Sequence, residues 1–471
     1  MSACRFHRFS PLTVALVLAA AWCAAGCHRG PYAGPRHSVL LLTIDSLRAD
    51  HLGCYGYRPP TSPRLDALAA QSILFRRAYA TAPWTLPSHV SILTGLDAAA
   101  HGVDTDRAVL GPRAATLAGV LRRHGYHTGA IVCAPLLRER YGLAPGFDNY
   151  DTSLIAASYR AARRVKVASS VTKKALAFLD QSTDRPFFLW LHYWDPHYDY
   201  DPPPRYVELF DPGYRGRLDG YDIQNRTDIV PGMNPADLRH LIALYDGEIR
   251  YTDDGIGALL DGLRKRGLLN NTLIVVVGDH GEEFLDHGGT GHTWTCYEEL
   301  VHVPLILHAP WLKPAAASFD EQVSITDIYP TVLSLLGIAY DPLKVQGRSL
   351  VNLITRGESL GARFLLMETR AGRLHPNGKV GLWTAMLTPA GAKLHHYARE
   401  ETVEMLFDLA ADPRERRDLS AERPAQVEEL HAQLLQMRRR DHQLFERLRL
   451  SHEQALDRQQ TDMLRGLGYL Q

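Results

Sequence analysis

The chain has 471 residues, and 45% of them are hydrophobic, which is enough to fill one large domain with a smaller unit beside it. Lysine plus arginine and aspartate plus glutamate both number 52, so the formal net charge is zero. This balance excludes the strongly basic surface that nucleic-acid binding requires, and we expect no nucleic-acid partner. The 22 histidines are more informative, because imidazole is the commonest metal ligand.

Residues 1–27 have the pattern of an export signal with a lipid-attachment site. Two arginines form a basic start, and Pro11–Ala25 is an apolar run that is short for a membrane span. The run ends in Ala24-Ala25-Gly26-Cys27, which is typical of a bacterial lipobox. An ordinary signal peptide with an incidental cysteine is the alternative. We therefore expect an exported bacterial lipoprotein, anchored to a membrane through Cys27 in the periplasm or at the cell surface, with a tether over 28–37.

Continuous apolar runs of strand length follow, separated by amphipathic helical stretches. Such runs suit strands that are buried on both faces of a parallel sheet. The runs are Ser38–Ile44, Thr128–Cys133, Pro186–Leu191, Thr272–Val277 and Val303–Leu307. The helical stretches include Ser62–Gln71, Thr116–His124 and Pro235–Arg266, the last with Asn234 as its N-cap. This alternation predicts an α/β fold: a doubly wound, mostly parallel sheet with helices on both faces.

A second unit is expected over 361–471, after a catalytic domain over 38–360. Four short runs predict a small antiparallel sheet: Arg363–Glu368, Gly381–Leu387, Lys393–Ala398 and Val403–Leu409. Pro424 is placed to start a helix, and apolar residues from Val427 to Leu448 keep helical spacing. We expect this helix to pack on the small sheet and the whole unit to serve as a structural cap without chemistry.

Polar residues directly follow three of the predicted strands. They are Asp45 after the first, His192, Asp195 and His197 after the third, and Asp279 and His280 after the fourth. Because ligands bind at the carboxyl ends of strands in open α/β sheets, these clusters should converge on one edge. A single aspartate after a strand is most often a helix N-cap. Three strand ends that carry aspartate and histidine together favour a ligand set for a divalent cation.

Thr85 is the candidate nucleophile. It stands just before Pro87 and Val90–Leu93, which resemble the opening of a helix closed by Thr94 and Gly95. A hydroxyl at this place lies among unpaired backbone N–H groups and near the positive end of the helix dipole. Those groups stabilise an alkoxide and the oxygens of a bound phosphate or sulfate. The alternative is that Thr85 merely caps the helix.

Seven strings along nearly the whole mature chain resemble the sulfatase family of the alkaline-phosphatase superfamily. Each string is moderately specific, and their order and spacing together are highly specific. The strings are V-L-L-L-T-I-D-S-L-R-A-D-H-L-G-C-Y-G at 39–56, T-L-P-S-H-V-S-I-L-T-G at 85–95, G-Y-H-T-G-A at 125–130, W-L-H-Y-W-D-P-H at 190–197, G-D-H-G-E-E at 278–283, Y-E-E-L-V-H-V-P at 297–304 and L-F-D-L-A-A-D-P-R-E-R-R-D-L at 406–419.

The resemblance implies a metal-dependent hydrolase of sulfate or phosphate esters. It assigns the ligands of one divalent ion to Asp45, Thr85, Asp279 and His280. It also implies that Thr85 is the nucleophile, that His197 holds the substrate anion and that His292 lies on the leaving-group side. The ion is calcium, manganese or zinc. A second ion, as in two-metal relatives, would use Asp195, His197 and His292. The expected partner is a sulfated or phosphorylated small molecule, glycan or lipid.

The sequence also departs from the family pattern. Sulfatases carry a cysteine or serine that is oxidised to formylglycine, and Thr85 cannot undergo this conversion, so we expect no formylglycine. His89 replaces the arginine of that motif, and Ser46 replaces the second aspartate of the metal site. A threonine nucleophile is similar to the phosphodiesterase and phosphotransferase branches of the superfamily. Two other functions stay open: a non-catalytic sulfatase-like binding protein and a phospho-headgroup transferase.

Overall fold

The computed structural model describes residues 37–156, 166–181, 185–372, 380–399 and 402–466. The predicted signal segment with its lipobox at Cys27, and the tether except His37, lie outside these ranges. Among the helices of the described ranges, none is both long enough and apolar enough to cross a membrane.

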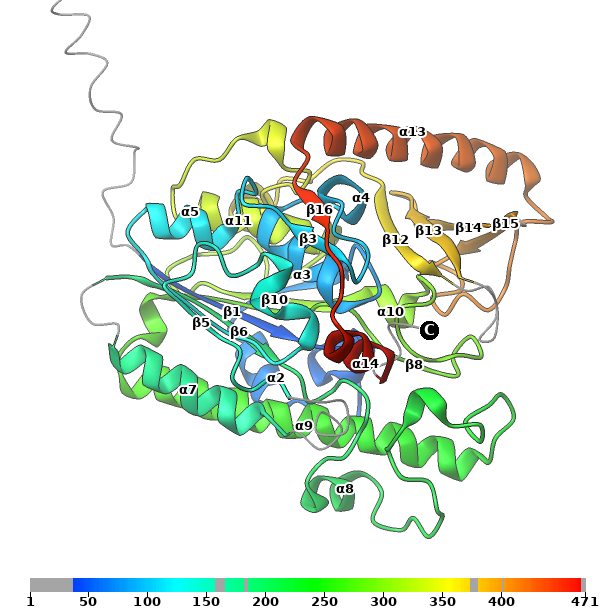
Figure 1. The fold of residues 1–471 in the computed structure, drawn as a ribbon, viewed down its shortest axis with the longest axis horizontal. Coiled ribbons are helices and arrows are strands. Elements are labelled where there is room, and N and C mark those ends of the chain that lie inside the picture. The colour runs from blue at the N-terminus through cyan, green and yellow to red at the C-terminus, as the bar shows by residue number, and fades with distance from the viewer. Residues whose placement is uncertain (1–36, 157–165, 182–184, 373–379, 400–401, 467–471) are drawn as a thin grey trace, which may run out of the picture.

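The core is an eight-stranded sheet with the order β11-β2-β10-β7-β1-β6-β4-β5 (Figure 1). Neighbouring strands are parallel except where β10 pairs with β7 and with β2. The prediction of a mostly parallel sheet is therefore confirmed. The strands are β1 (Ser38–Ile44), β2 (Ile73–Tyr79), β4 (His127–Ile131), β5 (Asn149–Asp151), β6 (Phe187–Tyr193), β7 (Thr272–Gly278), β10 (His302–His308) and β11 (Ser318–Ser324).

Three strands of this sheet have no counterpart among the predicted apolar runs. β5 and β11 lie at the two edges of the sheet, where a strand is covered less completely and carries polar residues. β2 lies between β10 and β11, but its Arg76 is exposed and breaks the apolar pattern. The run Val303–Leu307 does form a strand, yet it is antiparallel. An apolar run reports burial on both faces and carries no information on strand direction.

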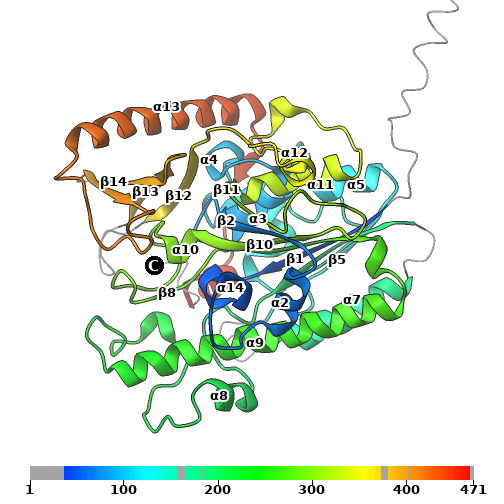
Figure 2. The same ribbon diagram turned by 180° about the vertical axis from the view of Figure 1, so that it is seen from behind.

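Helices cover both faces of the sheet (Figures 1 and 2). One face is covered by α2 (Pro63–Ala69), α7 (Ala168–Gln181) and α9 (Pro235–Lys265), and α8 (Pro204–Phe210) packs on α9. The other face carries α3 (Thr85–Thr94), α4 (Ala98–His101), α5 (Leu117–Arg123), α11 (Ile328–Leu335) and α12 (Val351–Arg356). The shorter elements are β3 (Ala108–Leu110), β8 (Glu283–Phe284), β9 (Thr290–Gly291), α10 (Glu298–Val301), β16 (Ser451–Glu453) and α14 (Arg458–Gly466).

Two helices begin at side-chain caps, one of which, Asn234, the sequence predicted. The Thr116 side chain accepts a hydrogen bond from the backbone N–H of Gly119 (3.1 Å) and starts α5. The Asn234 side chain accepts one from the backbone N–H of Ala236 (2.9 Å), and Pro235 is the first residue of α9. Each cap pairs a backbone N–H that would have no partner inside its helix.

The C-terminal part forms the predicted antiparallel sheet with its helix (Figure 2). The strands β12 (Leu365–Gly372), β13 (Gly381–Leu387), β14 (Ala392–Ala398) and β15 (Thr402–Asp408) pair in chain order. The helix α13 (Pro424–Leu448) packs on one face of this sheet. On the other face, Trp383 and Phe407 pack against residues of α10. The small sheet is thereby held between α13 and the main domain.

Candidate functional site

The carboxyl ends of β1, β6 and β7 carry the predicted polar residues to one place. β1 lies between β6 and β7, and in its register Thr43 is opposite His192 and Ile44 is opposite Gly278. Asp45 and Asp279, which follow β1 and β7, therefore meet at the same edge. Both carboxylates are fully buried, and a buried carboxylate requires donors or a cation close by.

Thr85 is the first residue of α3, and the helix begins two residues before the Pro87 start that the sequence suggested. The position before the first turn, where a capping side chain acts, is occupied by Trp84. The hydroxyl of Thr85 instead faces the strand ends, 3.5 Å from Asp45 Oδ2 and 3.4 Å from His280 Nε2. The side chain therefore joins the predicted ligand set at the positive end of α3.

Asp45, Asp279 and His280 form a group whose ligand atoms all lie within 4.8 Å of one another. His280 Nε2 is 3.4 Å from Asp45 Oδ1 and 3.5 Å from Asp279 Oδ2. The other ring nitrogen, Nδ1–H, donates to the carbonyl of Gly281 (2.9 Å), which leaves the lone pair on Nε2. This is the orientation that metal-binding histidines adopt.

Asp279 shows most directly that the group fits a cation. Its Oδ1 accepts the backbone N–H groups of Ser46 (3.2 Å) and His280 (2.9 Å). Its Oδ2 is buried without a hydrogen-bond partner and points at the Nε2 lone pair of His280. Two oxygens and one nitrogen without protons thus face one another, which is a ligand set that suits a divalent ion.

Without a cation, the negative charges of Asp45 and Asp279 repel each other. Burial, and then the neighbouring charge of Asp45, raise the pKa of Asp279 well above its ordinary value. Burial would also raise the pKa of Asp45, but the hydrogen bond from His192 and the nearby histidines lower it overall. Burial lowers the pKa of His280 to about 3. A divalent ion would stabilise both carboxylates as anions and leave the imidazole neutral.

His89 and His192 complete a second group with Asp279, but their hydrogen bonds give them positioning roles. His89 Nδ1–H donates to the carbonyl of Thr85 (2.8 Å), and its Nε2 accepts from the hydroxyl of Thr43 (3.0 Å). His192 Nε2 donates to Asp45 Oδ2 (3.1 Å). The sequence placed His192 at a strand end without a role. That role depends on the pairing of β6 with β1, in which His192 lies opposite Thr43, two residues before Asp45.

His292 and His197 lie next to this group. The ring centroid of His292 is 4.3 Å from that of His280 and 4.8 Å from that of His197. His292 Nδ1 is 2.9 Å from Glu282 Oε1. Burial raises the pKa of Glu282 to about 8 and lowers the pKa of His292 to about 4. The Glu282 carboxyl therefore fixes the orientation of the His292 ring through Nδ1. The sequence analysis did not single out Glu282.

Asp195 does not join His197 and His292. Its Oδ1 accepts the backbone N–H of Val167 (2.8 Å), just before α7. Among the described residues, the metal-ligand groups at this edge include neither Asp195 nor the two histidines. The resemblance to two-metal relatives suggested a second site with Asp195, but its carboxylate turns toward the start of α7, which is the alternative role of an aspartate after a strand.

The whole cluster is shielded from water. The side chains of Asp45, Thr85, His197, Asp279, His280 and His292 are each at most 1% exposed. Trp194 stacks on His197 with ring centroids 3.8 Å apart, and the Tyr198 ring lies 4.9 Å from that of His292. These aromatic residues come from the loop after β6. Exclusion of water strengthens every charge interaction inside this cluster.

Comparison with known proteins identifies the family. The sulfatase family model matches residues 37–338, and a model described as the C-terminal part of N-sulphoglucosamine sulphohydrolase matches residues 291–440. The chain belongs to the sulfatase family. It is a hydrolase that acts on sulfate or phosphate ester bonds.

Two curated relatives and one solved structure illustrate the similarity. An arylsulfatase of Clostridium perfringens is 27% identical over 438 residues, which cover 80% of this chain and 89% of that protein. N-sulphoglucosamine sulphohydrolase of Homo sapiens is 30% identical over 342 residues, which cover 69% of this chain and 65% of that protein. The structure of the phosphonate monoester hydrolase of Agrobacterium radiobacter aligns with a TM-score of 0.69 at 21% identity, and the alignment covers 86% of this chain and 96% of that one. At that identity the structural match supports the fold alone.

Two departures from the sulfatase pattern have visible structural roles. His89, in place of the motif arginine, is turned into the protein core and fixes the first turn of α3 through the carbonyl of Thr85. Ser46, in place of an aspartate, donates its hydroxyl to Asp45 Oδ1 (3.0 Å) and its backbone N–H to Asp279. Both residues therefore position the ligand set and add no charge to it.

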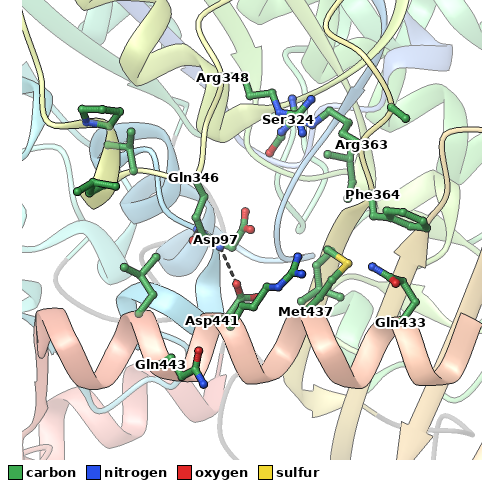
Figure 3. A pocket seen from close by; sticks show the side chains of 18 of the residues that line it. Asp97, Ser324, Gln346, Arg348, Arg363, Phe364, Gln433, Met437, Asp441 and Gln443 are labelled. Atoms are coloured by element: carbon green, nitrogen blue, oxygen red, sulfur yellow. Dashed lines mark hydrogen bonds between the residues drawn. The ribbon is translucent and has the colours of Figure 1, made fainter.

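A cavity of about 700 Å³ lies elsewhere, between α13 and the segment 342–348 (Figure 3). Inside it, the Gln346 amide donates to Asp441 Oδ1 (2.7 Å). Burial raises the pKa of Asp441 to about 6. None of the predicted site residues lines this cavity, so it is separate from the chemistry at the strand ends.

Proposed function

We propose that the protein cleaves sulfate or phosphate esters by nucleophilic attack of Thr85, next to a divalent ion. Asp45, Thr85, Asp279 and His280 would hold the ion. The observation that carries the proposal is the place of the Thr85 hydroxyl, at the start of α3 and within 3.5 Å of both Asp45 and His280. When bound, a divalent ion lowers the pKa of a coordinated hydroxyl and polarises the ester oxygens.

The residues of the chain supply the remaining parts of the reaction. Thr85 Oγ1 attacks phosphorus or sulfur and forms a covalent ester, while the bond to the leaving oxygen breaks. Backbone N–H groups in the first turn of α3 stabilise the non-bridging oxygens, and His197 holds the anion. His292 Nε2 passes a proton to the leaving oxygen while its Nδ1 takes a proton from Glu282 Oε1, so the imidazole stays neutral. The proton that Thr85 loses goes to water, and Glu282 regains a proton from water. Water then cleaves the ester and restores the Thr85 hydroxyl.

The substrate class follows from the same chemistry. We infer a sulfated or phosphorylated small molecule or glycan, and a lipid headgroup ester has the same reacting group. The human relative bears the name of a sulfated sugar, and the Agrobacterium relative that of a phosphonate monoester. A threonine nucleophile that cannot form formylglycine favours phosphorus esters within this range.

Turnover of model esters tests this proposal. Purified protein is assayed with aryl sulfates, phosphate monoesters, phosphate diesters and phosphonate monoesters, each with calcium, manganese or zinc added. We expect metal-dependent release of the leaving group from at least one ester of phosphorus, abolished by a chelator and restored by the ion. Absence of turnover on every ester, with the ion shown to be bound, would overturn the proposal.

The second candidate is a sulfatase-like binding protein. The observation in its favour is the complete burial of the six site residues, because a retained ion in a closed site needs no substrate path. The two candidates differ in the same assay: stoichiometric metal without any turnover is the result that the binding protein predicts.

Localisation remains a proposal that rests on the first residues of the sequence. We propose that Cys27 is acylated and that the protein is an exported, membrane-anchored lipoprotein. Metabolic labelling with a fatty acid analogue should label the wild type, and Cys27→Ser should lose the label and shift from the membrane to the soluble fraction. Cys54→Ser is the matched control, since this thiol lies within the folded domain. Unlabelled wild type, or Cys27→Ser that stays on the membrane, would contradict the proposal.

A further inference from the structure

We propose that His396, Glu404 and His431 form a divalent-metal site in the C-terminal part, separate from the catalytic cluster. The three residues come from β14, β15 and α13. One ligand atom of each lies within 4.8 Å of the other two. None of them belongs to the ligand set at the ends of β1 and β7.

The fold brings these residues together by two independent pairings. His396 and Glu404 are direct partners in the register of β14 and β15, and side chains opposite each other on one face of a sheet are in contact. His396 Nδ1 lies 3.2 Å from Glu404 Oε1. His431 follows Val427 by one helical turn on the side of α13 that packs on this sheet. Its Nδ1 contacts the same carboxylate oxygen.

The donor set matches zinc and related first-row ions. A common zinc site has two imidazole nitrogens and one carboxylate oxygen as ligands, with water in the fourth position. None of the three side chains is fully exposed: that of His396 is 9% exposed, that of Glu404 24% and that of His431 30%.

The site is open to solvent on one side. Glu404 and His431 line a surface groove of about 600 Å³, together with Glu428 and apolar residues of α13. An ion can therefore enter without any movement of the backbone. Once bound, it would link α13 to two strands of the small sheet, in addition to the apolar contacts of Val427, Leu430 and Leu434.

A simple hydrogen-bonded cluster is the competing account. Hydrogen bonds from both imidazoles to Glu404 Oε1 would explain the two contacts without a metal. A metal would instead use all three groups at once as ligands. The two accounts differ in one measurable respect, which is whether zinc binds here in preference to the rest of the surface.

Zinc titration of the full-length protein, freed of metal by a chelator, tests the proposal. We expect His431→Ala to bind one zinc ion fewer than the wild type, or to bind that ion at least roughly 100-fold more weakly, since even groups outside the ligand set change metal affinity 10–100-fold. His442→Ala, the same change at an exposed histidine of α13, should bind as the wild type does. An anomalous-scattering peak between His396 and His431 in zinc-soaked crystals would locate the ion.

Two controls keep the outcome clear. Asp279→Asn weakens the catalytic cluster, so the difference between His431→Ala and His442→Ala should persist in that background. Glu404→Gln keeps the size of the side chain, removes the charge and should reproduce the loss if His431→Ala disturbs α13. Equal zinc stoichiometry and affinity in wild type, His431→Ala and Glu404→Gln would overturn the proposal.

Discussion

Replacement of Thr85 with alanine is expected to reduce turnover by roughly 10⁶-fold, the loss seen when a nucleophile is removed from comparable sites. The side chain faces Asp45 and His280 at the start of α3, and its hydroxyl is the proposed nucleophile. Thr85→Ser keeps the hydroxyl and should retain measurable activity. Single-turnover experiments with the wild type should show a burst of leaving group and label on Thr85.

Thr94→Ala is the matched control for this experiment. Thr94 is the last residue of the same helix, is buried, and donates its hydroxyl to the carbonyl of Val90 (2.7 Å). Its removal should cost about 1 kcal/mol of stability and leave the rate per folded molecule unchanged. If Thr85 served only to cap α3, Thr85→Ala would behave as Thr94→Ala does. Full activity in folded Thr85→Ala protein would end the nucleophile assignment.

Replacement of Asp279 with asparagine is the second change with a large expected effect. The amide oxygen can still accept the two backbone N–H groups that Oδ1 now accepts, while an NH₂ group takes the place of Oδ2. An NH₂ group cannot bind a cation. We therefore expect loss of the stoichiometric catalytic metal and of turnover, with the fold preserved. Metal analysis by mass spectrometry, with circular dichroism for the fold, measures both.

Asp66→Asn provides the control for metal content. One oxygen of Asp66, on α2, also accepts two hydrogen bonds, from the backbone N–H of Cys54 (2.8 Å) and the hydroxyl of Ser62 (3.0 Å). Among the described residues, Asp66 belongs to none of the metal-ligand groups. This variant should keep the metal and the activity of the wild type. Equal metal in Asp279→Asn and Asp66→Asn would show that the ion does not depend on Asp279.

The sequence predicted the parts of the fold that depend on local patterns. Strand β1 has the residues that its apolar run indicated, and helix α9 begins at the cap and proline that the sequence indicated. The direction of β10 and the existence of β2 and β11 depend on pairing between distant segments. No local pattern carries that information, because the same apolar or mixed run suits either direction.

The candidate site shows the same difference between local patterns, which the sequence reveals, and contacts between distant residues, which it does not. Asp45 and Asp279 were found because they directly follow buried strands, and ligands bind at the carboxyl ends of strands in such sheets. Glu282 was missed because its role arises only from the contact with His292, ten residues further along the chain. Asp195 was grouped with His197 by analogy with two-metal relatives, although its carboxylate accepts a hydrogen bond from the backbone before α7. A family analogy does not give the direction of a side chain, which depends on its hydrogen bonds.

The position of β10 in the sheet sets the order in which the site can assemble during synthesis. Within the large sheet, β2 pairs only with β10 and β11, and α3 with Thr85 follows β2 directly. Asp45 and Asp279 belong to strands on the other side of β10. The sheet pairing that joins the strand before Thr85 to theirs is therefore complete only when the chain has grown past His308, although both partners are made earlier. Because closure of so long a loop is slow, we expect the complete sheet, and with it the full cluster, to form late.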